Sequence, residues 1–249
     1  MPAVFVHGNP ETSAIWGPLF AALRRDDIVA LSPPGFGAPV PQGFGATRLE
    51  YVDWLLGELE QIDGPIDLVG HDWGGGHVLG AMMARPELVR SWATDIAGVF
   101  TTDYVWHDAA QVWQTEGAGE EYVAGMVAAS TDDMVALYSS LGMTPEIARD
   151  VAEAVDEDMG RCILTLYRSA AQPAAGEAGA DLHNAAARPG LCILASEDHY
   201  VGGEALGRQA AEAAGAQVAV LEGLGHWWMI QDPATGAAVL ESFWSGVAD

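Results

Sequence analysis

Short apolar runs alternate with longer stretches of helical periodicity in the first part of the chain. Apolar runs of strand length cover residues 3–6, 28–31, 66–69 and 89–96. Apolar side chains at helical spacing cover residues 16–23, 49–62 and 77–84. Strands that alternate with helices in this way predict a parallel sheet covered by helices on both faces.

The pattern changes over residues 101–187, where strand-like runs disappear and helical periodicity dominates. Thr144 and Pro145 mark one helix start there, with threonine as the N-cap and proline at the first helical position. We expect residues 101–187 to form a helical cap. This cap would be inserted into a sheet domain made of residues 1–100 and 188–249.

The alternation of strands and helices returns after the predicted cap. The sequence predicts strands over residues 191–195 and 218–221, a helix over 204–214 between them, and a last helix that starts at Asp232 and Pro233. The alanine- and glycine-rich segment 174–180 precedes this part and is expected to be a surface link. The whole pattern therefore predicts an α/β fold whose sheet is interrupted once.

The chain is strongly acidic. It has 35 acidic and 10 basic residues, a net charge of −25, and no lysine. Such a charge repels phosphate backbones and anionic lipids, so we expect neither nucleic acid nor a membrane surface as a partner. No apolar run is long enough to span a bilayer and no signal-peptide pattern opens the sequence. We therefore expect a soluble, cytoplasmic protein.

The two cysteines, Cys162 and Cys192, lie among apolar neighbours. Their spacing fits no known pattern of metal ligands. We expect them to be buried free thiols rather than parts of a metal site.

The segment Gly70-His71-Asp72-Trp73-Gly74 joins the predicted strand 66–69 to the predicted helix 77–84. Small residues two positions before and after a central residue let a strand turn sharply into a helix, and this turn pushes the central side chain into a cleft. Here the central side chain is a carboxylate and not a serine hydroxyl. A carboxylate is suited to attack a saturated carbon and form an alkyl ester on the enzyme. We therefore predict that Asp72 is a nucleophile, with a plain turn-forming role as the alternative.

Two later loops supply the partners that such an ester needs. Asp198 and His226 each follow a predicted strand, and the carboxyl ends of parallel strands lie at one edge of a sheet. His226 is predicted to activate water against the ester, and Asp198 to orient the imidazole. The backbone N–H groups of Asn9 and Trp73 are predicted to form the oxyanion hole. Because all these groups belong to the protein, we expect no metal and no organic cofactor.

The role of the acid has two competitors. Glu197 is adjacent to Asp198, and Asp95 ends an earlier predicted strand. The other histidines are expected to be structural or exposed; they are His7, His71, His77, His107, His183 and His199.

These motifs resemble the aspartate-nucleophile branch of the α/β-hydrolases, which includes epoxide hydrolases and haloalkane dehalogenases. The elbow around Asp72 and the loops of Asp198 and His226 are similar to those of epoxide hydrolases. The segment His7-Gly8-Asn9-Pro10 is more similar to a haloalkane dehalogenase, in which residues matching Asn9 and Trp73 hold the leaving halide. The resemblance implies an α/β-hydrolase fold with a mostly parallel sheet of about six strands, because the family's N-terminal hairpin has no room here.

The predicted cap carries the distinction between these enzymes. Epoxide hydrolases use two cap tyrosines to donate hydrogen bonds to the epoxide oxygen. Tyr167 stands where the second is expected, whereas Ala109 stands where the first is expected. The candidate replacements are Tyr104, Trp106, His107 and Trp113.

The resemblance implies first an epoxide hydrolase-like enzyme that opens a small apolar epoxide to a diol through an ester on Asp72. Haloalkane dehalogenase activity is the alternative, and an inactive protein that binds a small ligand is a further one. A haloacid substrate is disfavoured, since Trp73 and Gly74 occupy positions at which such enzymes carry arginines. The expected partners are a small apolar electrophile and water, and a homodimer is left open.

Overall fold

A sheet of six parallel strands forms the centre of the molecule, in the order β2-β1-β3-β4-β5-β6. The computed structural model describes residues 1–248. The strands are β1 (Ala3–Val6), β2 (Ile28–Leu31), β3 (Asp67–Gly70), β4 (Ser91–Thr94), β5 (Gly190–Ala195) and β6 (Gln217–Leu221). The predicted parallel sheet of about six strands is confirmed.

Helices surround this sheet and fill the segment between β4 and β5. The α-helices are α1 (Gly17–Ala22), α2 (Arg48–Leu59), α3 (Trp73–Ala84), α4 (Asp108–Gln114), α5 (Ala118–Ala128), α6 (Thr131–Ser140), α7 (Pro145–Glu153), α8 (Glu157–Ser169), α9 (Ala174–Ala178), α10 (Gly203–Ala213), α11 (Trp228–Gln231) and α12 (Pro233–Ser245). The short 3-10 helices are η1 (Ser13–Trp16), η2 (Pro86–Leu88), η3 (Ala97–Phe100) and η4 (Gly179–Ala187).

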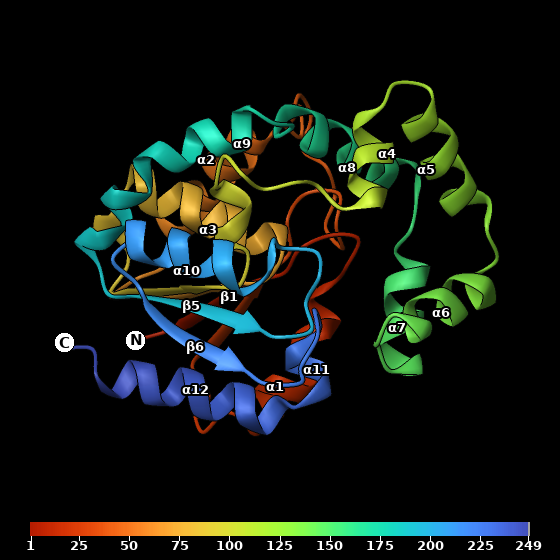
Figure 1. The fold of residues 1–249 in the computed structure, drawn as a ribbon. Helices are drawn as coiled ribbons and strands as arrows, with labels where there is room; N and C mark the ends of the chain where they lie inside the picture. Colours follow the sequence, from red (N-terminus) through yellow and green to blue (C-terminus); the bar gives the residue numbers. More distant parts are fainter. Residues whose placement is uncertain (249) are drawn as a thin grey trace.

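Both faces of the sheet are apolar, as expected when helices cover both sides. Along β1, Val4 and Val6 join one hydrophobic cluster, whereas Ala3 and Phe5 join the other, because successive side chains of a strand point to opposite faces. In Figure 1, α1, α11 and α12 lie on one side of the sheet, and α2, α3 and α10 lie on the other. The cysteines Cys162 and Cys192 are buried and free, as predicted.

The register of the sheet aligns the carboxyl ends of β1, β3 and β4. Val6 pairs with Gly70, and Gly70 pairs with Thr94. The loops that follow β1, β3 and β4 therefore begin side by side at the carboxyl edge of the sheet. This is the edge that faces the helices α4 to α7 in Figure 1, while the marked chain ends lie on the far side.

The helices between β4 and β5 form two groups. α4, α5 and α8 pack with one another, and α8 also contacts α2. α6 and α7 pack as a pair, and α7 contacts η1 beside the sheet. The start of α7 follows its sequence signal, since the Thr144 hydroxyl accepts a hydrogen bond from Ile147 N and Pro145 is the first helical residue. The division of the chain at residues 100 and 187 stays a prediction.

The segment 174–180 is not the surface link that its composition suggested. It contains α9, in which Ala175 and Gly176 are buried. A Cβ atom at Gly176 would lie 2.9 Å from Thr102 Cα, and one at Gly179 would lie 1.8 Å from Phe100 O. The small residues are therefore there because the backbone must pass close to η3, not because the segment is unpacked.

Helix α3 begins at Trp73, earlier than the predicted start at residue 77. The residues between them are three glycines, Gly74 to Gly76, which have a low helix propensity. Tertiary packing overrides that propensity, as the contacts of Gly74 described below show. No helix within residues 1–248 has the length and apolar character that crossing a bilayer would require.

Candidate active site

Asp72 occupies a strained turn between β3 and α3. Its backbone has φ 48° and ψ −130°, a region that residues with a side chain rarely adopt. A Cβ atom at Gly74 would lie 2.1 Å from Val6 O, and one at Gly70 would lie 2.5 Å from Gly74 O. Only glycines allow the helix to pass this close to β1. The turn holds the Asp72 side chain at the carboxyl edge of the sheet, where it is 7% exposed.

The two carboxylate oxygens of Asp72 have different surroundings. Oδ1 accepts a hydrogen bond of 3.0 Å from the backbone N–H of Asn9, in the loop after β1. Oδ2 lies 3.8 Å from His226 Nε2. Gly8 makes the approach possible, because a Cβ atom there would lie 2.2 Å from Asp72 Oδ1. Trp73 is the first residue of α3, so its N–H is among the free donors at the start of that helix.

The structure brings Asp198 to His226. His226 Nδ1 and Asp198 Oδ2 are 2.8 Å apart, and both side chains are buried. The other oxygen, Asp198 Oδ1, accepts a hydrogen bond of 2.8 Å from Tyr200 N. With the proton on Nδ1, the imidazole presents the lone pair of Nε2 toward Asp72. Asp72, His226 and Asp198 therefore meet in the arrangement of a nucleophile, a base and an orienting acid.

Asp95, the competitor of Asp198, lies beneath the elbow and holds it. Its Oδ1 accepts a hydrogen bond of 3.0 Å from the backbone N–H of Asp72. Its Oδ2 is 2.6 Å from His71 Nδ1 and accepts a hydrogen bond of 2.8 Å from Trp228 Nε1. The side chain of Glu197, the second competitor, instead lines an open pocket at the surface.

Glu11 and His71 complete a buried network that sequence reasoning missed. His71 Nε2 is 3.2 Å from Glu11 Oε1, and Trp227 Nε1 donates a hydrogen bond of 2.5 Å to the same oxygen. Glu11 Oε2 accepts a hydrogen bond of 3.0 Å from Gly8 N. The only sequence signal for Glu11 was an acid just after the Asn9 loop, and nothing there indicated that it would be buried.

An inner cavity of about 280 Å³ lies beside Asp72, lined by residues of both groups of helices that follow β4. Its lining is mostly aromatic and aliphatic; it consists of Asn9, Pro10, Asp72, His107, Ala109, Trp113, Tyr122, Met126, Met134, Leu137, Tyr138, Leu141, Tyr167, Tyr200, His226 and Trp227.

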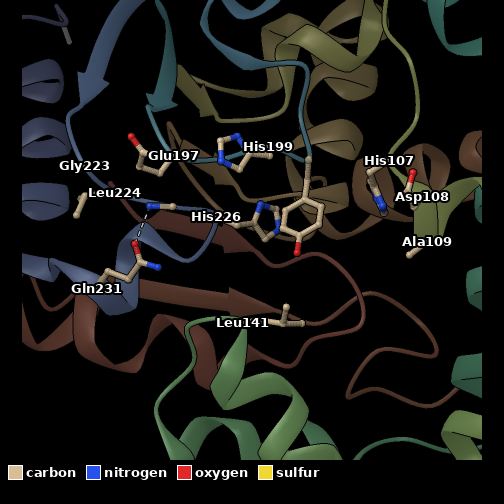
Figure 2. A pocket seen from close by; sticks show the side chains of 12 residues that line it. His107, Asp108, Ala109, Leu141, Glu197, His199, Gly223, Leu224, His226 and Gln231 are labelled. Carbon is tan, nitrogen blue, oxygen red and sulfur yellow. Dashed lines mark hydrogen bonds between the residues drawn. The ribbon is translucent and has the colours of Figure 1, made fainter.

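A more open outer pocket of about 870 Å³ shares several of these residues. In Figure 2, His226 lies in its middle, with Leu141 on one side and His107 and Ala109 on another. Gln231 closes a further side, where its Oε1 accepts a hydrogen bond from Gly225 N. The outer pocket therefore connects His226 with the surface.

The aromatic residues predicted as donors divide into two sets. Tyr167 and Trp113 line the inner cavity, as does His107. Tyr104 and Trp106 do not line it. The hydroxyl of Tyr104 donates a hydrogen bond of 2.5 Å to Tyr200 O, and the Trp106 ring stacks on Trp73 with 5.8 Å between centroids. Ala109 lines the inner cavity as well.

A model of the alpha/beta hydrolase family matches residues 3–239 of the chain. The chain belongs to the α/β-hydrolase family. Its six-stranded parallel sheet and the elbow after β3 agree with this family.

Individual relatives of this α/β-hydrolase are distant. It is 26% identical over 110 residues to (E)-2-((N-methylformamido)methylene)succinate hydrolase of Acinetobacter baylyi, a segment that covers 43% of this chain and 41% of that enzyme. The crystal structure of E-2-(acetamidomethylene)succinate hydrolase aligns with 98% of this chain and 91% of its own, at 17% identity and a TM-score of 0.76.

A haloalkane dehalogenase loop variant from Bradyrhizobium elkanii aligns with 100% of this chain and 91% of its own, at 21% identity and a TM-score of 0.73. At these identities the structural similarity shows the fold alone. The chemistry of this hydrolase has to be argued from its own residues.

Burial and neighbouring charges control the protonation of Asp72 and His226. Burial raises the pKa of Asp72 from 3.8 to about 6, although the charge of His226 opposes this. Burial by itself would lower the pKa of His226, but the charge and hydrogen bond of Asp198 outweigh it, so the pKa lies above 6.5. Asp72 therefore changes charge at about pH 6, whereas Asp198 favours the charged form of His226.

The same competition sets the charges of the network beneath the elbow. Burial opposes the charge of His71, but Asp95 and Glu11 outweigh it and raise the pKa of His71 well above 6.5. Burial would raise the pKa of Glu11, but the charge of His71 lowers it to about 2. His71 is therefore a buried imidazolium, and its single positive charge is shared between the carboxylates of Glu11 and Asp95.

Glu11, His71 and His226 also offer ligand atoms that lie within 4.8 Å of one another, close enough to suggest a metal site. Glu11 Oε1 already interacts with His71 and Trp227, and His226 Nδ1 with Asp198. A metal ion at this point would have to displace the hydrogen bonds that hold the elbow. The residues present fit a hydrogen-bonded network better than a metal site.

We expect Asp72→Asn to stabilise the protein, because the buried carboxylate is ionised at a cost. The folded-state pKa exceeds the ordinary value, so this cost grows as the pH rises from 3.8 to about 6 and persists above it. The gain should reach about 1 to 3 kcal/mol above this range and vanish below it. Thermal unfolding of the wild type and of Asp72→Asn, below and above this pH range, measures the gain in stability.

Asp53→Asn, on the exposed side of α2, is the matched control and should change stability by less than about 0.5 kcal/mol. An Asp72→Asn protein that is less stable than the wild type above the pKa of Asp72 would show that the ionised carboxylate stabilises the elbow.

Two further substitutions separate the roles of Asp198 and Asp95. Asp198→Asn removes the charge that raises the pKa of His226, so the pKa should fall by roughly 1 to 3 pH units. Asp95→Asn removes one partner of the buried His71 and should instead cost about 3–5 kcal/mol of stability. Imidazole titrations by NMR and denaturant unfolding measure both effects. A large fall in the pKa of His226 in Asp95→Asn but not in Asp198→Asn would reverse the assignment.

Proposed function

We propose that this α/β-hydrolase acts through a covalent alkyl ester on Asp72, most plausibly opening a small neutral epoxide to a diol. The observation that carries the proposal is the state of the Asp72 carboxylate. Oδ1 accepts a hydrogen bond from Asn9 N–H, Oδ2 lies 3.8 Å from Nε2 of the base His226, and Asp72 lines the inner cavity. A carboxylate so placed can attack carbon, and the base beside it can direct water onto the resulting ester.

In the first step, Oδ2 of Asp72 forms a bond to an epoxide carbon, and the bond from this carbon to the ring oxygen breaks. The electron pair moves to that oxygen, which then needs a proton. Tyr167 lines the same cavity, and burial, followed by the charge of Asp72, raises its pKa well above 10. Its hydroxyl therefore stays protonated and is available as the donor.

In the second step, His226 Nε2 takes a proton from water, and the oxygen of that water attacks Cγ of the ester. The negative charge develops on Oδ1, where Asn9 N–H already donates and Trp73 N–H is available at the start of α3. The bond from Cγ to Oδ2 then breaks, and the departing alkoxide takes the proton from His226. Asp198 stabilises the imidazolium between these transfers. The second hydrogen of the water remains on the regenerated Asp72 carboxyl, and this proton returns through solvent to the Tyr167 phenolate that the first step left.

The lining of the cavity favours an uncharged substrate. Within residues 1–248 no arginine lines the inner cavity or the outer pocket, and the chain has no lysine. Two of the distant relatives are named for succinate derivatives, which carry carboxylates. Such a group would meet no fixed cation here, so we do not extend those substrates to this chain.

Haloalkane dehalogenase activity is the second candidate, and a specific observation favours it. The side-chain amide of Asn9 has no hydrogen-bond partner in the described structure, and the indole N–H of Trp73 makes no hydrogen bond of standard geometry. Two unpaired N–H donors beside Asp72 suit a leaving halide. The Trp73 indole also packs against the Tyr167 ring, with 5.5 Å between the centroids, and lowers the pKa of the Tyr167 hydroxyl. A lower pKa makes this hydroxyl the better proton donor, and this favours the epoxide.

We expect His226→Gln to trap the alkyl ester, because the first step needs no base and the second does. Intact-protein mass spectrometry after exposure to a small terminal epoxide, or to a bromoalkane of equal length, identifies the reagent. The epoxide adds its full mass, whereas the bromoalkane adds only the alkyl group. Asp72→Asn combined with His226→Gln is the control and should show no adduct. Absence of any adduct with either reagent would favour the inactive ligand-binding alternative.

Tyr167→Phe tests the leaving-group assignment. Loss of the donor should slow alkylation of the His226→Gln protein by the epoxide roughly 100-fold or more, because the ring oxygen must then leave unprotonated. Alkylation by the bromoalkane should change far less, since bromide needs no proton. Rates of adduct formation measure both. Equal slowing of the two reagents would indicate that Tyr167 shapes the cavity without donating a proton.

A further inference from the structure

The inner cavity contains polar atoms that the proposed reaction does not use. Most buried polar groups in proteins have a hydrogen-bond partner, so those without one call for an explanation. Among the residues that line this cavity, the unpaired atoms belong to Asn9, Trp113 and Tyr138. Asn9 borders Asp72 and belongs to the reacting end. Trp113 Nε1 and Tyr138 Oη remain without an assigned role.

Tyr138 is the more informative of the two. It lies on α6, its side chain is 3% exposed, and its hydroxyl has no acceptor within residues 1–248. Its neighbours in the cavity wall, Met134, Leu137 and Leu141, are apolar and come from α6 or the turn after it. A buried phenol in such a wall costs free energy unless something that enters the cavity accepts its hydrogen bond.

Tyr138 and Tyr167 reach the inner cavity from different groups of helices. Tyr138 lies on α6, which packs with α7, whereas Tyr167 lies on α8, which packs with α4 and α5. Tyr167 packs against Trp73, the residue next to Asp72, with 5.5 Å between the ring centroids. A substrate bound at Asp72 would therefore present a different part of itself to each tyrosine.

We propose that Tyr138 is a specificity residue that donates a hydrogen bond to a neutral acceptor oxygen at the end of the substrate remote from the reacting carbon. The substrate class is then a small epoxide with an apolar middle and a distal carbonyl or ether oxygen. The middle would lie against Met126, Met134 and Trp227. A carboxylate does not fit this position, because no arginine lines the cavity. This proposal rests on the proposed function, since Asp72 defines which end of the cavity is the reacting one.

A matched pair of substrates tests the proposal. One is an epoxyketone whose carbonyl lies at the end opposite the epoxide, and the other is its methylidene analogue, in which CH₂ replaces the carbonyl oxygen. The wild type should prefer the ketone in kcat/KM by roughly 3- to 10-fold, as one net hydrogen bond provides. Tyr138→Phe should abolish this preference by raising KM for the ketone while kcat stays unchanged. The reason is that the hydrogen bond is equally strong in the ground state and in the transition state.

Tyr122→Phe is the matched control. Tyr122 lines the same cavity but is 40% exposed, so its hydroxyl can be hydrated without a ligand. The preference for the ketone should keep its wild-type value in this variant. A preference that survives in Tyr138→Phe, or one that Tyr122→Phe abolishes equally, would overturn the assignment of Tyr138.

A binding measurement separates failure of this proposal from failure of the proposed function. A medium-chain methyl ketone and its methylidene analogue can be titrated into Asp72→Asn and into Asp72→Asn with Tyr138→Phe, with tryptophan fluorescence as the signal. The ketone should bind roughly 3- to 10-fold more weakly to the double variant than to Asp72→Asn. The analogue should bind the two variants with equal affinity. Equal ketone affinities would overturn the proposal even if epoxides are turned over. A loss of ketone affinity without any epoxide turnover would contradict only the epoxide assignment.

The stability of Tyr138→Phe distinguishes recognition from a structural role. Removing an unpaired buried hydroxyl should leave the melting temperature unchanged or raise it. A hydroxyl that held α6 in place would lower the melting temperature when removed, and that result would contradict the proposal.

Discussion

The burial of the Asp72 carboxylate on a strained turn is the constraint on which the site depends. The turn has a positive φ, so surrounding contacts must hold it in place. Two hydrogen bonds provide these contacts. The Asp95 carboxylate accepts one from the backbone N–H of Asp72, and the backbone N–H of Asn9 donates the other to the Asp72 side chain. Gly8 and Gly74 allow the close approach. The turn holds the carboxylate in a buried position, and this burial raises its pKa to about 6.

A second consequence is the balance of charge beneath the elbow. Four buried carboxylates, from Glu11, Asp72, Asp95 and Asp198, are arranged around two imidazoles, from His71 and His226. His71 places one positive charge between Glu11 and Asp95, whose remaining lone pairs accept N–H groups from Gly8, Trp227 and Trp228. This arrangement gives the two imidazoles different roles. The carboxylates on both sides of His71 keep it charged, whereas His226 can gain and lose a proton because one of its nitrogens faces the cavity.

The fold was largely predictable from the chain, because its signals are local. β1 and β2 have the predicted limits, and the other strands and core helices differ from prediction mainly at their ends. The departures have tertiary causes. α3 begins before residue 77 because Gly74 must pass the backbone of β1, and segment 174–180 is packed because α9 must pass close to η3. In both segments the glycines and alanines are present because the backbone packs closely, and not because the segment is a loop. Amino-acid composition alone cannot distinguish these two causes.

The sequence by itself determined the order of strands and helices, the elbow at Asp72 and the candidates Asp198 and His226, because each depends on residues close together in the chain. Only the tertiary structure decided which acid meets His226, since the loops after β3, β4, β5 and β6 converge only in the folded sheet. It also revealed Glu11, His71 and Tyr138. These residues matter because they are buried and because their hydrogen-bond partners are shared or absent. Both properties depend on contacts between residues far apart in the chain, which no local sequence pattern contains.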